Sequence, residues 1–217
     1  ELPDGNIAIR ILNEDGSFFK NASIKPEKII VIDDFEQNKM SIYGISHGEI
    51  VTTFLRRNNP FAQIETINTG LADTMNPEFL EHFKQILQRI KNGEKIDYIS
   101  CSKGAICYST GKDMRGKFPQ FQPITDVADS GTRVLFASGN SIDNPTGTAN
   151  QVLLLADKIE GVGSLSPQTH KLSKFSSSRN SFFTQHYEVG EHYIRPTEYG
   201  ANITGLQGTD IVINNPK

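Results

Sequence analysis

The chain has 217 residues, of which 36% are hydrophobic and 22% charged, and it carries a formal net charge of −3. This length suits one domain with a buried core, and a slightly acidic chain lacks the concentrated basic face that nucleic acid or an anionic membrane requires. No apolar run in the sequence approaches the roughly 18 residues that a membrane span needs.

The N-terminal part predicts an exposed strand followed by a buried one. Residues 6–12 alternate apolar and polar side chains and end in the turn sequence Asn-Glu-Asp-Gly, which is typical of a half-exposed strand. Residues 28–32 form a nearly continuous β-branched run, as in a parallel strand that is covered on both faces. We therefore interpret residues 1–27 as a strand and lead-in to the sheet.

Strands and helices are predicted to alternate from residue 28 to residue 140. Further apolar strands are expected at residues 62–67, 96–101 and 132–137. Helices are expected at residues 47–57, 77–91 and 124–128, the second of them capped by an asparagine and stopped by Asn-Gly. This alternation predicts a single three-layer α/β domain over residues 1–217, in which helices cover both faces of a doubly wound, mostly parallel sheet.

The pattern weakens after residue 140. Residues 152–156 fit either a helix or a strand, whereas residues 158–165 and residues 187–194 each predict one strand. The serine-rich residues 173–181 contain and adjoin phenylalanines, which favours a packed loop over a disordered linker. The redox state of Cys101 and Cys107 stays open, because a bridge between them and two separate thiols both fit the sequence.

Polar residues follow three of the predicted strands. These are Asp33-Asp34, Ser102-Lys103-Gly104 and Ser138-Gly139-Asn140. The carboxyl ends of parallel strands meet at one edge of a sheet, where functional groups of open α/β folds gather, and His47 at the start of the next helix is expected to join them. Each residue taken alone also fits a structural role, such as a turn aspartate or a left-handed asparagine.

Taken in order, these segments resemble the motifs of the subtilisin-like serine proteases. Val31-Ile32-Asp33 resembles the strand that carries the triad acid, and Ser46-His47-Gly48 resembles the segment of the triad histidine. Residues 99–104 look like the segment whose backbone pairs with extended substrate, and Ala137-Ser138-Gly139-Asn140 is similar to the oxyanion-hole motif. The resemblance covers about residues 28–210.

The resemblance implies a role for each of these residues. Asp33 would orient His47 and stabilise its charged form, and Asn140 would donate its side-chain amide to a developing oxyanion. Ser102, Lys103 and Gly104 would bind the backbone of a peptide substrate. The family also implies structural calcium, for which the sequence shows no acidic loop, so no cofactor is predicted.

The nucleophile motif of the family is altered in this chain. Gly208-Thr209-Asp210 stands where the family has Gly-Thr-Ser, so an aspartate replaces the serine. A carboxylate has no proton for His47 to remove and is a poor nucleophile toward an amide, and beside His47 it would favour the imidazolium. We interpret residues 195–217 as a degenerate nucleophile region and tail without the usual C-terminal helices.

Two other departures lie near the predicted triad. Phe35 occupies the place of the usual glycine after the triad acid, and Glu49 occupies the place of the usual threonine after the His-Gly pair. The sequence as a whole predicts a catalytically impaired subtilisin-like domain, a pseudoenzyme that binds a peptide or protein in an extended groove. The chain begins without methionine, and with the resemblance this favours a secreted protein in an extracellular or periplasmic location.

Two alternatives remain open. The first is an active serine endopeptidase whose nucleophile lies elsewhere in the chain or beyond Lys217. The second is a metal site formed by Asp33 or Asp34 with His47 and Asp210, two hard oxygens and one imidazole, although no sequence spacing supports it.

Overall fold

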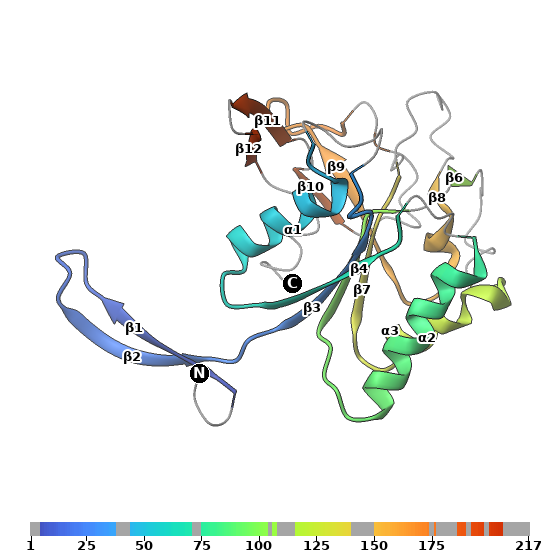
Figure 1. The fold of residues 1–217 in the computed structure, drawn as a ribbon, viewed down its shortest axis with the longest axis horizontal. Coiled ribbons are helices and arrows are strands. Elements are labelled where there is room, and N and C mark those ends of the chain that lie inside the picture. The colour runs from blue at the N-terminus through green and yellow to red at the C-terminus, as the bar shows by residue number, and fades with distance from the viewer. Residues whose placement is uncertain are drawn as a thin grey trace.

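The computed structural model describes residues 5–37, 44–70, 75–103, 106–107, 116–139, 150–173, 176, 186–189, 192–197 and 200–205. At its centre lies a six-stranded sheet in which every neighbouring pair of strands is parallel (Figure 1). The order across the sheet is β10-β9-β7-β5-β3-β4. These strands are β3 (Lys28–Asp33), β4 (Gln63–Asn68), β5 (Tyr98–Cys101), β7 (Arg133–Ala137), β9 (Glu160–Leu165) and β10 (His186–Val189).

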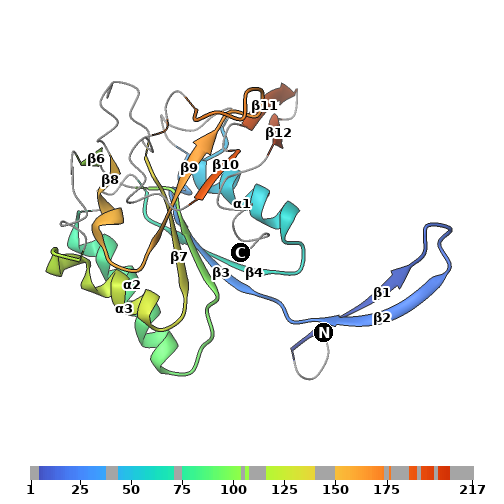
Figure 2. The ribbon, with the colours of Figure 1, turned by 180° about the vertical axis from the view of Figure 1, so that it is seen from behind.

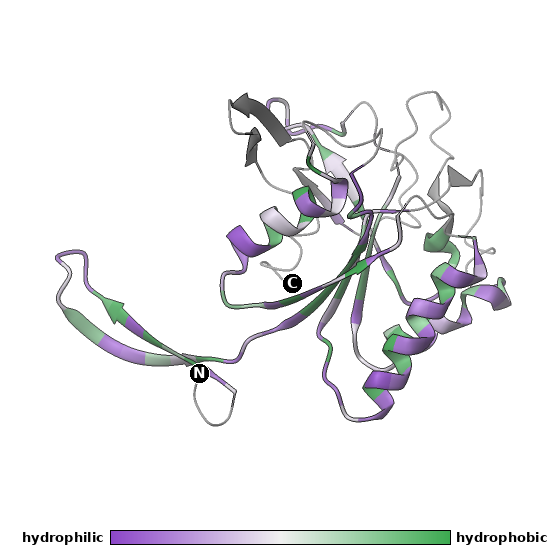
Figure 3. Cartoon of the chain, viewed as in Figure 1, coloured by the Kyte–Doolittle hydropathy of each residue, from purple (hydrophilic) through white to green (hydrophobic). Residues whose placement is uncertain are grey.

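Helices cover both faces of this sheet. Helix α1 (His47–Asn58) packs on one face, and α2 (Pro77–Lys91) and α3 (Gln122–Asp129) pack on the other. Strand β3 shows why, since all but its first residue are buried: Ile29 and Val31 contact the side of α1, and Ile30 and Ile32 face α2 and α3. Figure 3 shows hydrophobic residues gathered along the central strands. The predicted doubly wound α/β fold is confirmed.

An N-terminal hairpin lies outside this layered core. Strand β1 (Ile7–Leu12) pairs antiparallel with β2 (Phe18–Ile24), and both views show the hairpin extending away from the sheet (Figure 2). Only the first strand was expected from the sequence. The second strand reads Phe-Phe-Lys-Asn-Ala-Ser-Ile, which lacks the regular alternation that would have identified it, and its pairing register shifts between Ile11 and Leu12.

The C-terminal part differs most from the prediction. The single strand expected at residues 187–194 is wrong, because β10 joins the central sheet whereas β11 (His192–Thr197) pairs antiparallel with β12 (Gly200–Gly205) in a separate sheet. Residue Gly190, a common turn residue, falls between the two strands and was passed over in the prediction. Residues 206–217, where helices were expected to be missing, lie outside the described residues.

Shorter elements complete the described structure. Residues Val152–Leu155 form a 3-10 helix, which decides between the helix and strand expected there, and a second one spans Pro119–Phe121. Strand β6 (Ile106–Cys107) pairs antiparallel with β8 (Asn150–Gln151). None of the helices in the described ranges combines the length and hydrophobicity that crossing a bilayer requires.

The thiol of Cys101 is free and fully buried at the end of β5, which excludes the bridge to Cys107. Burial raises the pKa of this thiol far above its usual range, because the thiolate would lose its hydration inside the core. Cys101 is therefore an inert core residue at neutral pH.

Candidate active site

The candidate site lies at the carboxyl ends of β3 and β5, where the order of the strands reverses. From β3 the chain passes through α1 to β4 on one side, and then returns through α2 to β5 on the other side of β3. In open α/β sheets the ligand crevice forms at this switch point, because the flanking connections leave toward opposite faces. Asp33 ends β3 there, and Ser102 and Lys103 follow β5.

Asp33 and His47 form a hydrogen-bonded pair at this edge. His47 Nδ1 lies 2.9 Å from Asp33 Oδ1, and the backbone N–H of Asp34 donates to the same oxygen at 2.7 Å. Asp33 is only 1% exposed, whereas the imidazole side chain is 46% exposed. With Nδ1 directed at Asp33, Nε2 is the nitrogen that can exchange a proton with a bound ligand.

A capping box fixes the start of the helix that carries His47. The backbone N–H of Ser46 donates to Glu49 Oε2 at 2.7 Å, and the backbone N–H of Glu49 donates to Ser46 Oγ at 3.3 Å. This reciprocal arrangement satisfies N–H groups that a helix start leaves without partners. Glu49, a departure from the family pattern, therefore has a structural reason: it holds His47 as the first residue of α1.

Phe35, the other departure, packs against the same helix start. A Cβ atom on Gly48 would lie 2.8 Å from three ring carbons of Phe35, closer than real contacts allow. The backbone N–H of Gly48 also donates to the carbonyl of Asp34 at 2.7 Å. The bulky ring at 35 and the missing side chain at 48 are thus complementary, and together they tie the end of β3 to α1.

Residues at and just after the end of β4 form hydrogen bonds with the backbone around Asp33. Thr69 donates to the carbonyl of Asp33 through its backbone N–H at 2.9 Å and its Oγ1 at 3.1 Å. Asn68 Oδ1 accepts from the backbone N–H groups of Phe35 and Gly70 at 3.0 and 2.9 Å. These residues were not predicted from the sequence, although Asn-Thr-Gly after a strand is the same kind of signal as the other polar strand ends.

The electrostatic surroundings favour the charged form of His47. Burial disfavours the imidazolium, but the hydrogen bond to Asp33 and the negative charges of Asp33 and Asp34 outweigh it, so the pKa of His47 is raised above its ordinary value. The positive charge of Lys103, whose Nζ donates to the carbonyl of Gly70, opposes this shift. The pair is therefore biased toward an aspartate–imidazolium ion pair.

The structure brings four of the predicted site residues to one edge and leaves three undescribed. Asp33, His47, Ser102 and Lys103 lie at the carboxyl edge, and the catalytic and binding roles assigned to them remain predictions. The other three predicted residues, Gly104, Asn140 and Asp210, lie outside the described residues. Within the described ranges, no group of three or more His, Cys, Asp or Glu side chains is arranged to hold a metal ion.

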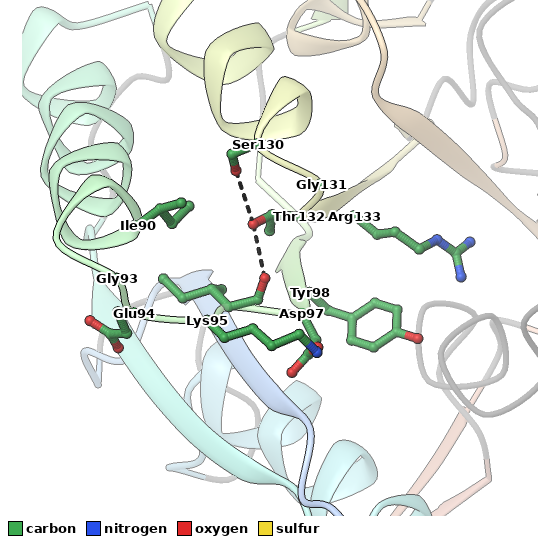
Figure 4. A pocket seen from close by; sticks show the side chains of 11 residues that line it. Ile90, Gly93, Glu94, Lys95, Asp97, Tyr98, Ser130, Gly131, Thr132 and Arg133 are labelled. Carbon is green, nitrogen blue, oxygen red and sulfur yellow. Dashed lines mark hydrogen bonds and ion pairs between the residues drawn. The ribbon is translucent and has the colours of Figure 1, made fainter.

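A hollow of about 410 Å³ lies at the opposite, amino edge of the sheet (Figure 4). Thr132 and Ile96 both line it, and Thr132 Oγ1 donates to the carbonyl of Ile96 at 2.9 Å. The charged side chains that line it are bound to protein partners: Lys95 to Asp97, Glu94 to Arg89 and Lys28, and Arg133 to Glu160. With its charges paired in this way, the hollow is a weaker candidate for a functional site than the carboxyl edge.

The fold matches solved structures of subtilisin-like serine proteases. The sequence itself matches no protein-family model and no curated protein. The prenylagaramide maturation protease PagA has a TM-score of 0.57 at 16% identity, over 87% of this chain and 71% of that one. The epidermin leader peptide processing protease EpiP from Staphylococcus aureus has a TM-score of 0.56 at 14% identity, over 86% and 62% of the two chains. The PatG macrocyclase in complex with peptide has a TM-score of 0.51 at 12% identity, over 86% and 72%.

Proposed function

We propose that this chain is a catalytically impaired, subtilisin-like peptidase domain that binds an extended peptide at the carboxyl edge of its sheet. The observation that carries the proposal is the 2.9 Å contact between Asp33 and His47 at the switch point of this fold, combined with Asp210 in the place of the family's serine. The acid and base of a triad are present, and the residue that they should activate is a carboxylate.

The chemistry of an aspartate at the nucleophile position argues against turnover. In an active triad the histidine removes a proton from the serine hydroxyl and later passes it to the leaving amine. Asp210 offers no such proton at neutral pH, and its charge would add to those of Asp33 and Asp34 in favouring the imidazolium. A histidine that is already protonated cannot serve as a general base.

Peptide binding needs only the backbone that follows β5. Strand β5 pairs with β3 and β7 as far as Cys101, so the chain at Ser102 and Lys103 leaves the sheet at the same edge as the Asp33–His47 pair. An extended peptide could pair with such a segment through main-chain hydrogen bonds. Peptides as ligands also agree with the names of the neighbours, a macrocyclase in complex with peptide and a protease that processes a leader peptide.

A comparison of binding and turnover on one set of peptides tests this proposal. We expect the protein to bind unstructured peptides in a fluorescence anisotropy assay and to leave them, and casein, uncleaved by mass spectrometry after prolonged incubation. Lys103→Glu, which reverses a charge at the proposed binding segment, should change the affinity, and Lys84→Glu on the outer face of α2 serves as the matched control. Absence of binding to every peptide would overturn the proposal.

The geometry of the Asp33–His47 pair also favours a second candidate, an active serine endopeptidase that uses another serine. The pair has the contact that catalysis requires, and its imidazole is half exposed at the edge of the sheet. Turnover of casein that is lost in His47→Ala, with the variant still folded by circular dichroism, would support this candidate over the first.

A further inference from the structure

Buried polar atoms without hydrogen-bond partners gather near the Asp33–His47 pair. Asp33 Oδ2, Ser102 Oγ and Ser100 Oγ are all inaccessible and have no partner in the described part of the chain. The two oxygens of Asp33 thus differ sharply: Oδ1 receives hydrogen bonds from His47 and Asp34, whereas Oδ2 receives none from any residue in the described ranges. A buried carboxylate oxygen that lacks a donor destabilises the folded protein, so a donor is expected nearby.

Extending the sheet register by one residue brings Ser102 beside Asp33. Strands β3 and β5 are parallel, with Ile32 opposite Cys101, so Asp33 and Ser102 are the next residues along each chain. Neighbouring strands lie roughly 4.8 Å apart, within reach of two short side chains. Because side chains alternate between faces, and Ile32 and Cys101 face α2 and α3, Asp33 and Ser102 lie on the face that carries α1 and His47.

We propose that Ser102 is a positioning residue whose hydroxyl donates a hydrogen bond to Asp33 Oδ2 when the carboxylate is ionised. The serine side chain has three staggered rotamers, and rotation about χ1 redirects its hydroxyl. With this bond both oxygens of Asp33 have donors. The orientation of the carboxylate is then fixed, so that Oδ1 stays directed at His47 Nδ1. The inference rests on the proposed function only in that this function gives the Asp33–His47 pair its purpose.

Ser102 is a positioning residue and not a substitute nucleophile. Its Oγ is inaccessible, so a peptide carbonyl cannot approach it. The hydrogen bond instead spreads the negative charge of Asp33 over a second donor, which weakens the attraction of that carboxylate for the imidazolium. Losing the donor leaves more of the negative charge of Asp33 to act on His47.

A pH titration of the His47 ring by NMR tests this role without any substrate. The charged groups that act on His47 are Asp33 and Asp34 at the end of β3 and Lys103 after β5, and none of them is altered in the variants. In Ser102→Ala the pKa of His47 should rise by about half a unit, roughly a threefold gain in proton affinity. Ser102→Thr, which keeps a hydroxyl, should restore the wild-type titration.

Ser100→Ala is the matched control, because Ser100 lies on the same face of β5 and its hydroxyl also lacks a partner, but it pairs with Val31 instead of Asp33. This control should leave the titration of His47 unchanged. A titration of Ser102→Ala that coincides with that of Ser100→Ala would overturn the inference. Neither result depends on peptide binding or turnover, so a failure of the proposed function remains distinguishable from a failure of this role.

Discussion

The two edges of the central sheet use the same kinds of charged residue in opposite ways. Toward the amino edge, Arg89 holds Glu65 with two contacts of 2.6 Å and Glu94 with two of 2.8 Å, and Lys28 joins the network. These side chains are about one-third exposed, so water still solvates part of their charge. The pKa of Glu94 falls to about 2, because Arg89 and Lys28 donate hydrogen bonds to its carboxylate.

At the carboxyl edge, Asp33 is buried, one of its oxygens has no partner among the described residues, and the other contacts a titratable histidine. Burial of a charge without full pairing costs folding free energy, whereas exposed paired charges contribute modestly to it. The comparison teaches that the amino edge pairs its charges in partly exposed networks, whereas the carboxyl edge pairs a buried acid with a titratable histidine, an environment that perturbs a pKa.

Replacing Asp33 should produce the largest effect, a change in the pKa of His47 at the carboxyl edge. In Asp33→Asn the pKa of His47 should fall by more than ~1 unit, because its charged partner is lost. The free energy of unfolding at pH 7 should fall, because the imidazolium of His47 loses the charged partner that stabilises it in the folded protein. An NMR titration and urea unfolding measure the two quantities; an unchanged titration would contradict the assigned pair.

Asp33→Asn should also change how the stability of the protein depends on pH. The pKa of His47 is raised in the folded protein, so its contribution to stability is full below the unfolded pKa of about 6.5 and is lost as the pH rises through the folded value. Wild-type stability should therefore decline over that window, and Asp33→Asn should remove the decline. A steeper decline in the variant would contradict the account.

Filling the space between the helix start and the phenylalanine should have the next largest effect. Gly48→Ala places a Cβ against the ring of Phe35 and should lower the free energy of unfolding by about 1–3 kcal/mol. In a Phe35→Ala background the same substitution should cost far less, which a double-mutant cycle by urea unfolding measures. Equal costs in both backgrounds would show that the ring does not cause the loss.

The amino edge should lose moderate stability when its central arginine is removed. Arg89→Met should cost about 1–2 kcal/mol, because it leaves two carboxylates without their shared partner. Lys84→Met, which breaks only the exposed pair with Glu81, is the matched control and should cost less than about 0.5 kcal/mol. Equal losses would mean that the network adds nothing beyond single surface pairs.

The dependence of stability on pH in acid reports on the same network of Arg89, Glu94 and Lys28. The pKa of Glu94 is lowered to about 2 by Arg89 and Lys28, so its stabilisation is present above the unfolded value of about 4.3 and is lost as the pH falls toward about 2. Arg89→Met should flatten the stability profile in this window. An unaltered profile would contradict the assignment.

The capping box should have the smallest effect on stability. Glu49→Ala removes the acceptor of the Ser46 N–H and should cost about 0.5–1 kcal/mol by thermal or urea unfolding. Glu78→Ala, in the first turn of α2 where Asn76 supplies the cap, is the control and should cost less. Equal costs would assign the effect of Glu49 to charge alone.

Much of the central sheet was predictable because its signals are local. The β-branched run of β3 and the apolar stripes of α1 and α2 specify buried elements, and the alternation of types specifies a doubly wound sheet. The hairpin and the separate β11–β12 sheet were not predictable in this way, since a register shift and a break near Gly190 leave little trace in hydrophobic periodicity.

The candidate site was predictable only in part. Asp33 at the end of a strand and His47 at the start of a helix stand out in the sequence, and the structure brings them into contact. The support from Thr69, the complementarity of Phe35 with Gly48 and the placement of Ser102 beside Asp33 depend on which strands are neighbours and in what register. Single-sequence patterns do not carry that information.

The most direct test of the central claim is labelling with a serine-directed fluorophosphonate, read by mass spectrometry. If Asp33 and His47 remain placed for catalysis and Asp210 has replaced the nucleophile, the unmodified protein should stay unlabelled and Asp210→Ser should form an adduct at residue 210. His47→Ala in the Asp210→Ser background should abolish that adduct. An adduct at any serine of the unmodified protein would contradict the account.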